Sequence, residues 1–334
     1  MKSICIFNNK GGVGKTTLLC NLGAYLSQER RKNVLIIDCD PQCNATAYML
    51  QEQVLEDIYV KNKGGTIDDV IKPLKRGKGF AKGSLPIRKS IGFKLDLIPG
   101  DPKFSLAEDF LSKDWVDVAG GGERGLRTTT FVKEMLSECE SYDYVFFDVG
   151  PSLGAINRTV LLASDFFLIP ISSDIFSLRG LQNIEIAVHS WKDELARGLE
   201  AFQRKEGGPF LVDGGSIDPP LQFLGYVTQQ YTAKTVEGKK QPVKAYERII
   251  RRIGPTIKKH VIDVFNKNSS LDYSLGEIPN LQSVVPMSQI ACKPIFALGA
   301  KDGVVGSHFY KIREFKNVMM KIAKNMESNV SALA

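Results

Sequence analysis

Residues 10–17 read Lys-Gly-Gly-Val-Gly-Lys-Thr-Thr, and no other segment constrains the fold of this chain as strongly. An apolar run precedes this glycine-rich loop, and leucines at helical spacing follow it from Leu18. Glycines at a strand-to-helix turn let backbone N–H groups approach phosphate oxygens, and the helix N-terminus adds partial positive charge. Lys15 is placed for the β and γ phosphates, and the Thr16 hydroxyl for Mg²⁺. The segment predicts a phosphate-binding loop made of Lys10, Gly11, Gly12, Val13, Gly14, Lys15, Thr16 and Thr17.

Apolar runs alternate with helical patterns along the chain. The runs span residues 3–7, 33–37, 95–98, 144–147, 166–169 and 223–228, and helical patterns span 16–28, 127–139 and 178–195. Several runs are continuous rather than alternating, as in strands that are covered on both faces. We therefore expect an α/β fold with a mostly parallel, twisted sheet and helices on both faces. We expect one domain over residues 1–325, insertions near 61–94 and 204–220, and a flexible C-terminal tail over 326–334.

Composition excludes several classes of protein. The 334 residues contain no apolar stretch of membrane-spanning length, and the first predicted strand begins near Met1, so we expect no signal peptide. Six cysteines without a CxxC pair, accompanied by only three histidines, argue against a zinc site or a disulfide framework. We expect reduced thiols and a cytoplasmic protein.

Two further motifs place carboxylates at predicted strand ends. Asp38 and Asp40 follow the run at 33–37, and Asp148 follows four residues of a Walker-B pattern at 144–147. In a parallel sheet these ends meet at one edge, where ligands bind. Hydrolysis of a phosphoanhydride needs an oriented water and compensation of charge, which carboxylates and a metal ion provide.

The loop departs from the usual phosphate-binding pattern, because Asn9 stands where a glycine is expected and Lys10 follows it. This xKGGxGKT form resembles the ParA/MinD family of ATPases with a deviant Walker-A loop, and it is most similar to ParA/Soj-type partitioning ATPases. The resemblance implies ATP and Mg²⁺ as cofactors and an ATP-dependent homodimer in which Lys10 reaches the partner's nucleotide. It also implies catalytic roles for Lys10, Lys15 and Asp40, a metal site of Thr16, Asp40 and Asp148, and a position for Asp38 behind Asp40.

Other segments match the family less closely. Ile278-Pro279-Asn280-Leu281 resembles the stretch whose backbone touches the base, but its asparagine is displaced by one position, so Leu281 stands in its place. We expect Pro279, Leu281 and Gln229 near the adenine. After Asp148, Gly150 replaces the first proline of the family's Asp-x-Pro-Pro-Ser, which we expect to affect loop stiffness more than metal binding.

Positive charge is concentrated in two segments. Residues 231–260 carry nine Lys/Arg and two Glu, and residues 72–94 carry eight Lys/Arg and no acid, whereas the whole chain has a net charge of +7. Two basic segments on an otherwise acidic chain indicate a polyanionic partner. In the first segment an apolar stripe predicts a helix, and Lys244, Arg248, Arg251 and Arg252 fall largely on its other face. We expect these four residues to contact DNA phosphates without reading sequence. A merely solvated helix face, and a flexible loop at 72–94, are the alternatives.

The C-terminal residues 309–326 also have an amphipathic helical pattern with lysines between the apolar positions. Such a helix packs on the sheet or lies on a membrane, as in MinD-like relatives.

The leading hypothesis is a ParA-like ATPase whose ATP dimer binds DNA non-specifically and releases it on hydrolysis, to position a DNA or protein cargo. We expect slow hydrolysis that a partner protein stimulates. The alternatives are a membrane-cycling MinD-like ATPase and an ATP-gated protein of regulation or defence. An electron donor like the nitrogenase iron protein is excluded, because residues 149–159 contain no cysteine.

Overall fold

The computed structural model describes the chain except residues 84, 218–220, 230–233, 237–238, 242–243, 267–269 and 282, and for 234–236, 239–241, 244–248 and 250 it describes the backbone alone. Its main sheet has eight strands. In spatial order they are β12 (Ser274–Ile278), β9 (Gln222–Gln229), β6 (Phe166–Ser172), β1 (Lys2–Ile6), β5 (Tyr144–Asp148), β2 (Val34–Asp38), β4 (Leu95–Ile98) and β3 (Arg88–Ser90). All neighbours are parallel except β3 and β4. The predicted mostly parallel sheet is confirmed.

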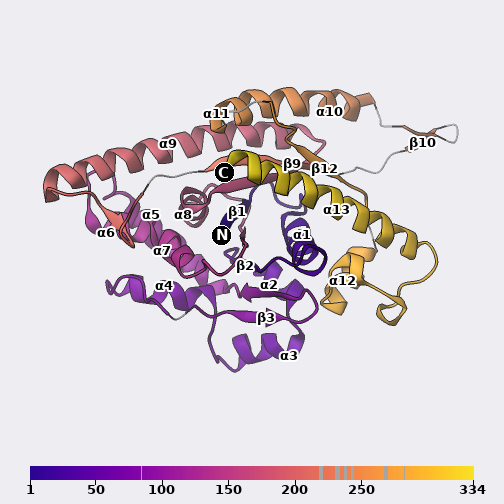
Figure 1. Cartoon of the computed structure of the whole chain (residues 1–334), viewed down its shortest axis with the longest axis horizontal. Coiled ribbons are helices and arrows are strands. Elements are labelled where there is room, and N and C mark those ends of the chain that lie inside the picture. Colours follow the sequence, from indigo (N-terminus) through magenta and orange to yellow (C-terminus); the bar gives the residue numbers. More distant parts are fainter. Residues whose placement is uncertain are drawn as a thin grey trace.

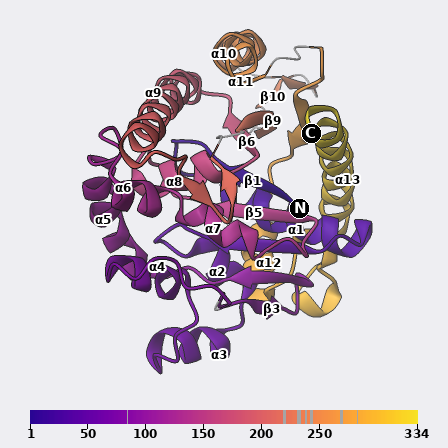
Figure 2. The same cartoon turned by 60° about the vertical axis from the view of Figure 1, so that its left-hand side comes forward.

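Helices cover both faces of this sheet, which explains the continuous apolar runs (Figure 1, Figure 2). Within β1, Ile4 and Ile6 belong to one core and Cys5 to the other, as the period of two requires. The first core is closed by α1 (Lys15–Arg30), α2 (Asn44–Met49), α12 (Val284–Ala291) and α13 (His308–Leu333). The second is closed by α4 (Ile67–Lys75), α5 (Leu106–Trp115), α6 (Glu123–Thr129), α7 (Phe131–Ser137), α8 (Ala155–Ala163), α9 (Ile175–Glu206) and α10 (Lys244–Ile257).

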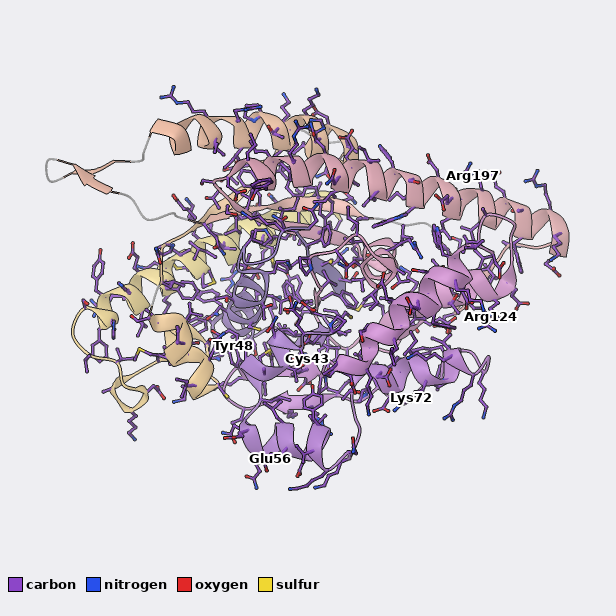
Figure 3. All side chains as sticks on the ribbon, turned by 180° about the vertical axis from the view of Figure 1, so that it is seen from behind. Cys43, Tyr48, Glu56, Lys72, Arg124 and Arg197 are labelled. Atoms are coloured by element: carbon purple, nitrogen blue, oxygen red, sulfur yellow. The ribbon has the colours of Figure 1, made fainter. Side chains whose placement is uncertain are left out.

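The remaining elements are short. They are α3 (Glu52–Leu55), α11 (Asp263–Phe265), π-helical stretches Glu56–Val60 and Lys258–Ile262, 3₁₀ turns Pro102–Ser105, Ile295–Ala297 and Ala300–Asp302, and the strand pairs β7 (Leu211–Val212) with β8 (Gly215–Ser216) and β10 (Lys234–Val236) with β11 (Lys239–Gln241). Charged side chains such as Lys72 and Arg124 lie at the periphery, whereas Tyr48 is buried and bonds Asn21 and Ser288 (Figure 3).

The six predicted strands are all present, but two other predictions were wrong. The helix expected at 127–139 is divided between α6 and α7 at Thr130, whose φ of −97° and ψ of 6° depart from helical values and whose hydroxyl bonds the Leu126 carbonyl. Residues 61–94, where we expect an insertion, include α4, whose start is a capping box of Thr66 and Asp69. Asp68 and Asp69 pair with Lys72 and Lys75, so part of that basic run is neutralised.

The second error concerns the C-terminus. Residues 326–334, expected as a flexible tail, continue α13 to Leu333. Val330 is buried, and the Asn329 amide donates to the carbonyls of Leu224 and Asp272, both at 3.0 Å. These contacts hold the last turns of the helix on the sheet. No helix within the described residues is long and apolar enough to cross a bilayer.

Candidate nucleotide site

The predicted phosphate loop joins β1 to α1 at the carboxyl edge of the sheet. Gly12 and Gly14 both have φ of 73°, a left-handed conformation that glycine adopts without steric cost. Lys15 is almost fully buried, and its ammonium donates to the carbonyls of Asn8 at 3.2 Å and Lys10 at 3.3 Å. Burial lowers the pKa of Lys15, while the charges of Asp148 and Asp40 oppose that shift. The loop therefore holds a cation directly beside two carboxylates.

Asp148 offers a place for a metal ion. The parallel register pairs Asp148 with Ile6 of β1 and with Asp38 of β2, so three strand ends meet here. The Thr16 hydroxyl donates to Asp148 Oδ2 at 2.8 Å, and Asp148 Oδ1 is buried without a hydrogen-bond partner among the described residues. Burial and the nearby Asp38 raise the pKa of Asp148 well above its usual value. A divalent cation fits such a site, because it relieves both the burial of a carboxylate and the unpaired oxygen.

Asp38 and Asp40 have different surroundings. Asp38 is fully buried, and its Oδ2 accepts from the Thr46 amide at 2.8 Å and the Thr46 hydroxyl at 2.6 Å. Burial raises the pKa of Asp38 to about 7, although the bonds from Thr46 oppose the shift. Asp40 lies nearer the loops: its Oδ1 accepts from the Gln42 amide, and a Cβ built on Gly150 would lie 3.4 Å from the same oxygen. Asp38 thus supports the segment from behind, and Asp40 faces the Asp148 loop.

Lys10 pairs with a carboxylate of its own chain. Its ammonium lies 2.5 Å from Asp174 Oδ2, and the side chain is 34% exposed. Asp174 is the N-cap of α9, since its other oxygen accepts from the amides of Phe176 at 3.0 Å and Ser177 at 3.1 Å. Sequence reasoning missed Asp174, although an aspartate directly before an apolar helical pattern is a capping signal.

The residues expected near the adenine surround a cavity of about 250 Å³ beside the phosphate loop. Its walls include Gly12, Thr17, Gln229, Pro279, Leu281 and Phe315. The Gln229 amide donates to the Val13 carbonyl at 2.5 Å. Gln229 pairs with Ile278 in the register of β9 and β12, so both strands end at this cavity. The structure brings all three expected residues together there.

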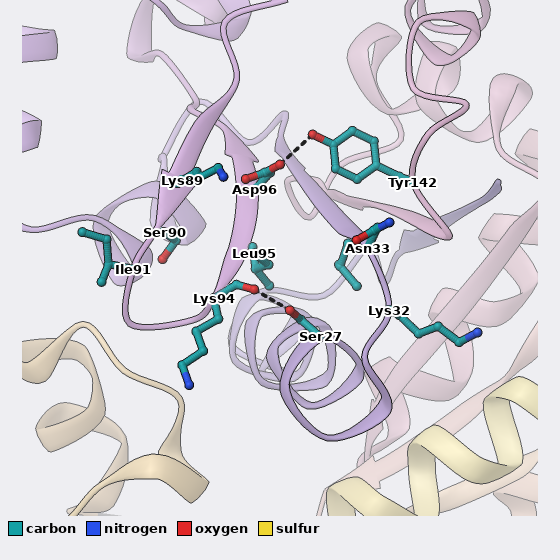
Figure 4. Close-up of a pocket in the computed structure, with 11 residues that line it drawn as sticks. Ser27, Lys32, Asn33, Lys89, Ser90, Ile91, Lys94, Leu95, Asp96 and Tyr142 are labelled. Carbon is teal, nitrogen blue, oxygen red and sulfur yellow. Dashed lines mark hydrogen bonds between the residues drawn. The ribbon is translucent and has the colours of Figure 1, made fainter.

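A second cavity, of about 390 Å³, lies far from this edge. It is at the amino ends of β2 and β4 and is lined by Ser27, Asn33, Lys89, Lys94, Asp96 and Tyr142, among others (Figure 4). The Tyr142 hydroxyl donates to Asp96 at 2.8 Å. None of the predicted site residues lines this cavity.

The expected DNA-contacting residues lie on α10, which packs along α9 (Figure 1). Ile253 and Ile257 are buried, whereas Arg251 and Arg252 are exposed, as the amphipathic pattern predicts. The side chains of Lys244 and Arg248 lie outside the described residues. A groove of about 460 Å³ along these helices also contains Lys259 of the predicted basic segment, and it adds Arg179 of α9, which sequence reasoning did not place with them.

Comparison with known proteins agrees with this geometry. A family model described as an AAA domain (AAA_31) matches residues 1–201. Protein DIP2308 from Corynebacterium diphtheriae is 32% identical, with a TM-score of 0.71 over 87% of this chain and 97% of that one. The chromosome-partitioning ATPase Soj of Thermus thermophilus is 27% identical over 71% of this chain and 72% of its own length. The ATP complex of McdA from Cyanothece, at 18% identity, has a TM-score of 0.59 over 98% and 96% of the two chains and shows the same fold.

The chain therefore belongs to the AAA-domain family and, within it, to the ParA/MinD group of phosphate-loop ATPases that includes the ParA and Soj partitioning proteins.

Proposed function

We propose that this protein is an ATPase whose two copies, each holding ATP and Mg²⁺, close into a sandwich dimer. The observation that most directly supports this proposal is the position of Lys10. This lysine belongs to the phosphate loop, yet it is partly exposed and lies beside Asp174 rather than over its own loop. Next to Asp174, Ile175 is 48% and Phe176 is 73% exposed. An exposed aromatic residue beside a nucleotide loop favours an interface that a second copy covers.

The residues at the site divide the work of hydrolysis. Lys15 and the amides of residues 11–17 would bind the phosphates, and Thr16 and Asp148 would hold Mg²⁺, with Asp40 nearby. The metal ion would compensate charge on the phosphate oxygens. Asp40 would orient the attacking water, while Asp38 and Thr46 fix the Asp40 segment. Lys10 of the partner copy would add positive charge where it develops in the transition state.

The basic groove between α9 and α10 supports DNA as the matrix. One concave surface is lined by Arg179 of α9, by Arg251 and Arg252 of α10, and by Lys259 of the π-helical stretch that follows α10. Guanidinium and ammonium groups on a rigid helix face bind phosphates regardless of sequence, and such binding weakens steeply with salt. ATP binding would assemble the DNA-bound dimer, and hydrolysis would release it. We propose that a partner protein stimulates slow hydrolysis, and that the cycle positions a DNA or protein cargo in the cytoplasm, on the nucleoid.

A membrane as the matrix loses its main support. The apolar stripe of α13 includes Ile312, Phe315, Met319, Ile322 and Met326, and all five are buried against the sheet. That face is not available to lipid without unpacking the core.

The test is binding of random-sequence duplex DNA to the Asp40→Ala protein with ATP–Mg²⁺, with ADP and without nucleotide, over a salt series. We expect the protein to bind DNA with ATP–Mg²⁺ but not with ADP or without nucleotide, and we expect the affinity for DNA to fall as salt rises. Equal binding in all three states would refute nucleotide gating, and no binding in any state would remove DNA from the proposal.

A further inference from the structure

The loop after Asp148 has Gly150 in place of the first of the family's two prolines, and two side chains hold the loop. Asn157, buried in the first turn of α8, donates to the carbonyls of Gly150 at 2.7 Å and Ser152 at 2.6 Å. Glu108 of α5 approaches from the other side. Its two carboxylate oxygens accept from the amides of Ala155 and Ile156, the latter at 3.0 Å.

Glu108 thus caps a helix to which it does not belong. The first amides of a helix have no partner within it, and a carboxylate there is stabilised by the helix dipole. Gly154 makes this approach possible, because a Cβ on that residue would collide with the Glu108 carboxylate. Further along α8, the buried guanidinium of Arg158 stacks on Trp115, the last residue of α5, at 4.0 Å from the ring centre and lies near Glu108. Both α8 and α5 are therefore anchored where Glu108 joins them.

The loop that Glu108 fixes contacts the reacting groups. Gly150 faces Asp40 Oδ1, and Pro151 lies against the phosphate loop, 3.9 Å from a Cβ built on Gly11. The residues that lead into α5 are linked to the other aspartate through Thr46. The Gly100 amide donates to the Thr46 hydroxyl at 2.8 Å, and that hydroxyl donates to Asp38. Residues 100–108 therefore bridge the Asp38–Asp40 segment and the Asp148 loop.

We propose that Glu108 is a positioning residue for ATP hydrolysis, which sets the loop of residues 149–154 against Asp40 and the phosphate loop through the amides of Ala155 and Ile156. This inference rests on the proposed ATPase activity. Glu108 does not touch the reacting atoms, so its loss misplaces the loop rather than removing a phosphate contact. A small displacement of a positioning element lowers the rate of the chemical step much more than it weakens substrate binding.

The experiment compares Glu108→Ala and Glu108→Gln with Asp109→Ala. Asp109 is the exposed neighbour in the same first turn of α5, so its removal changes the charge and the helix dipole in the same way. We expect kcat of Glu108→Ala to fall at least about tenfold with KM for ATP changed less than about twofold. Glu108→Gln, which keeps an acceptor oxygen, should recover part of kcat, and Asp109→Ala should match wild type.

Hydrogen exchange gives a second measure that does not depend on activity. The amides of Ala155 and Ile156 should exchange at least about tenfold faster in Glu108→Ala and at the wild-type rate in Asp109→Ala. Unchanged kcat in Glu108→Ala, or a kcat loss that is the same in Asp109→Ala, would overturn the inference. An inactive wild-type protein would instead refute the ATPase activity and the inference together. An active wild type with unchanged amide exchange in Glu108→Ala would refute the positioning role of Glu108 alone.

Discussion

Lys10 Nζ lies 2.5 Å from Asp174 Oδ2, so the lysine that distinguishes this phosphate loop is held by the N-cap of α9 in the same chain. In the proposed dimer this lysine acts on the partner's nucleotide. It must therefore exchange Asp174 for phosphate oxygens, which would leave the N-cap carboxylate of α9 without its lysine partner. The groove with Arg179 is also lined by Ile175, the residue directly after Asp174 in the same helix.

The Lys10–Asp174 pair should give stability a specific dependence on acid. Partial burial would raise the pKa of Asp174, but bonds from Lys10 and other donors hold it at about 2, below the usual 3.8. A carboxylate with a lowered pKa stabilises the fold above its unfolded pKa, and that contribution is lost as pH falls toward the folded value. Urea unfolding should show wild type more stable than Asp174→Asn at pH 7, with the difference shrinking between pH 4 and pH 2. A difference that does not change with pH would contradict the pairing.

Asp38 should make the stability of the fold depend on pH in the opposite direction from Asp174. Its pKa is raised to about 7, so the native protein holds a proton that the unfolded chain releases near pH 4. Stability without nucleotide or metal therefore falls as pH rises from about 4 to 7. Asn at this position carries no charge at any pH. The Tm of Asp38→Asn relative to wild type should rise from pH 5 to pH 8, and a constant offset would show that Asp38 is ionised throughout.

Gln229 should contribute to binding of the base of ATP and not to binding of its phosphates. It lines the cavity beside the loop and donates to the Val13 carbonyl. We expect Gln229→Ala to raise the Kd for ATP about fivefold to tenfold, the value of one lost polar contact, while the Kd for inorganic tripolyphosphate stays within about twofold. Calorimetry with both ligands makes the comparison. Equal weakening for the two ligands would place Gln229 in the phosphate site instead.

Arg251 and Arg252 should contribute to DNA affinity through charge alone. Replacing both by Gln should weaken binding equally for duplexes of different sequence and reduce the slope of log K against log salt by about 2 for each copy in the dimer, since each phosphate contact contributes about 0.9. Arg197→Gln, an exposed arginine further along α9, is the control (Figure 3). A sequence-dependent loss, or an equal loss in the control, would argue against non-specific contacts by this groove.

Sequence reasoning located the elements that follow strong local rules. Continuous apolar runs identified six strands because buried parallel strands tolerate few polar residues, and the positions of Asp38 and Asp148 at strand ends followed directly. It missed β12, whose Ser274, Gly276 and Glu277 hide the strand pattern, and it ended α13 too early, where Asn329 bonds two distant carbonyls. The Lys10–Asp174 pair joins residues 164 positions apart, and the bond from the Ala155 amide to Glu108 joins residues 47 positions apart, so local patterns do not connect them.

The central claim is that ATP closes a dimer through Lys10, and the most direct measurement is molar mass by light scattering of the Asp40→Ala protein and of Asp40→Ala combined with Lys10→Ala. With ATP–Mg²⁺ the single variant should have the mass of two chains and with ADP the mass of one, whereas the double variant should bind ATP and remain a monomer. An ATP-bound double variant that dimerises as fully as the single variant would contradict the account.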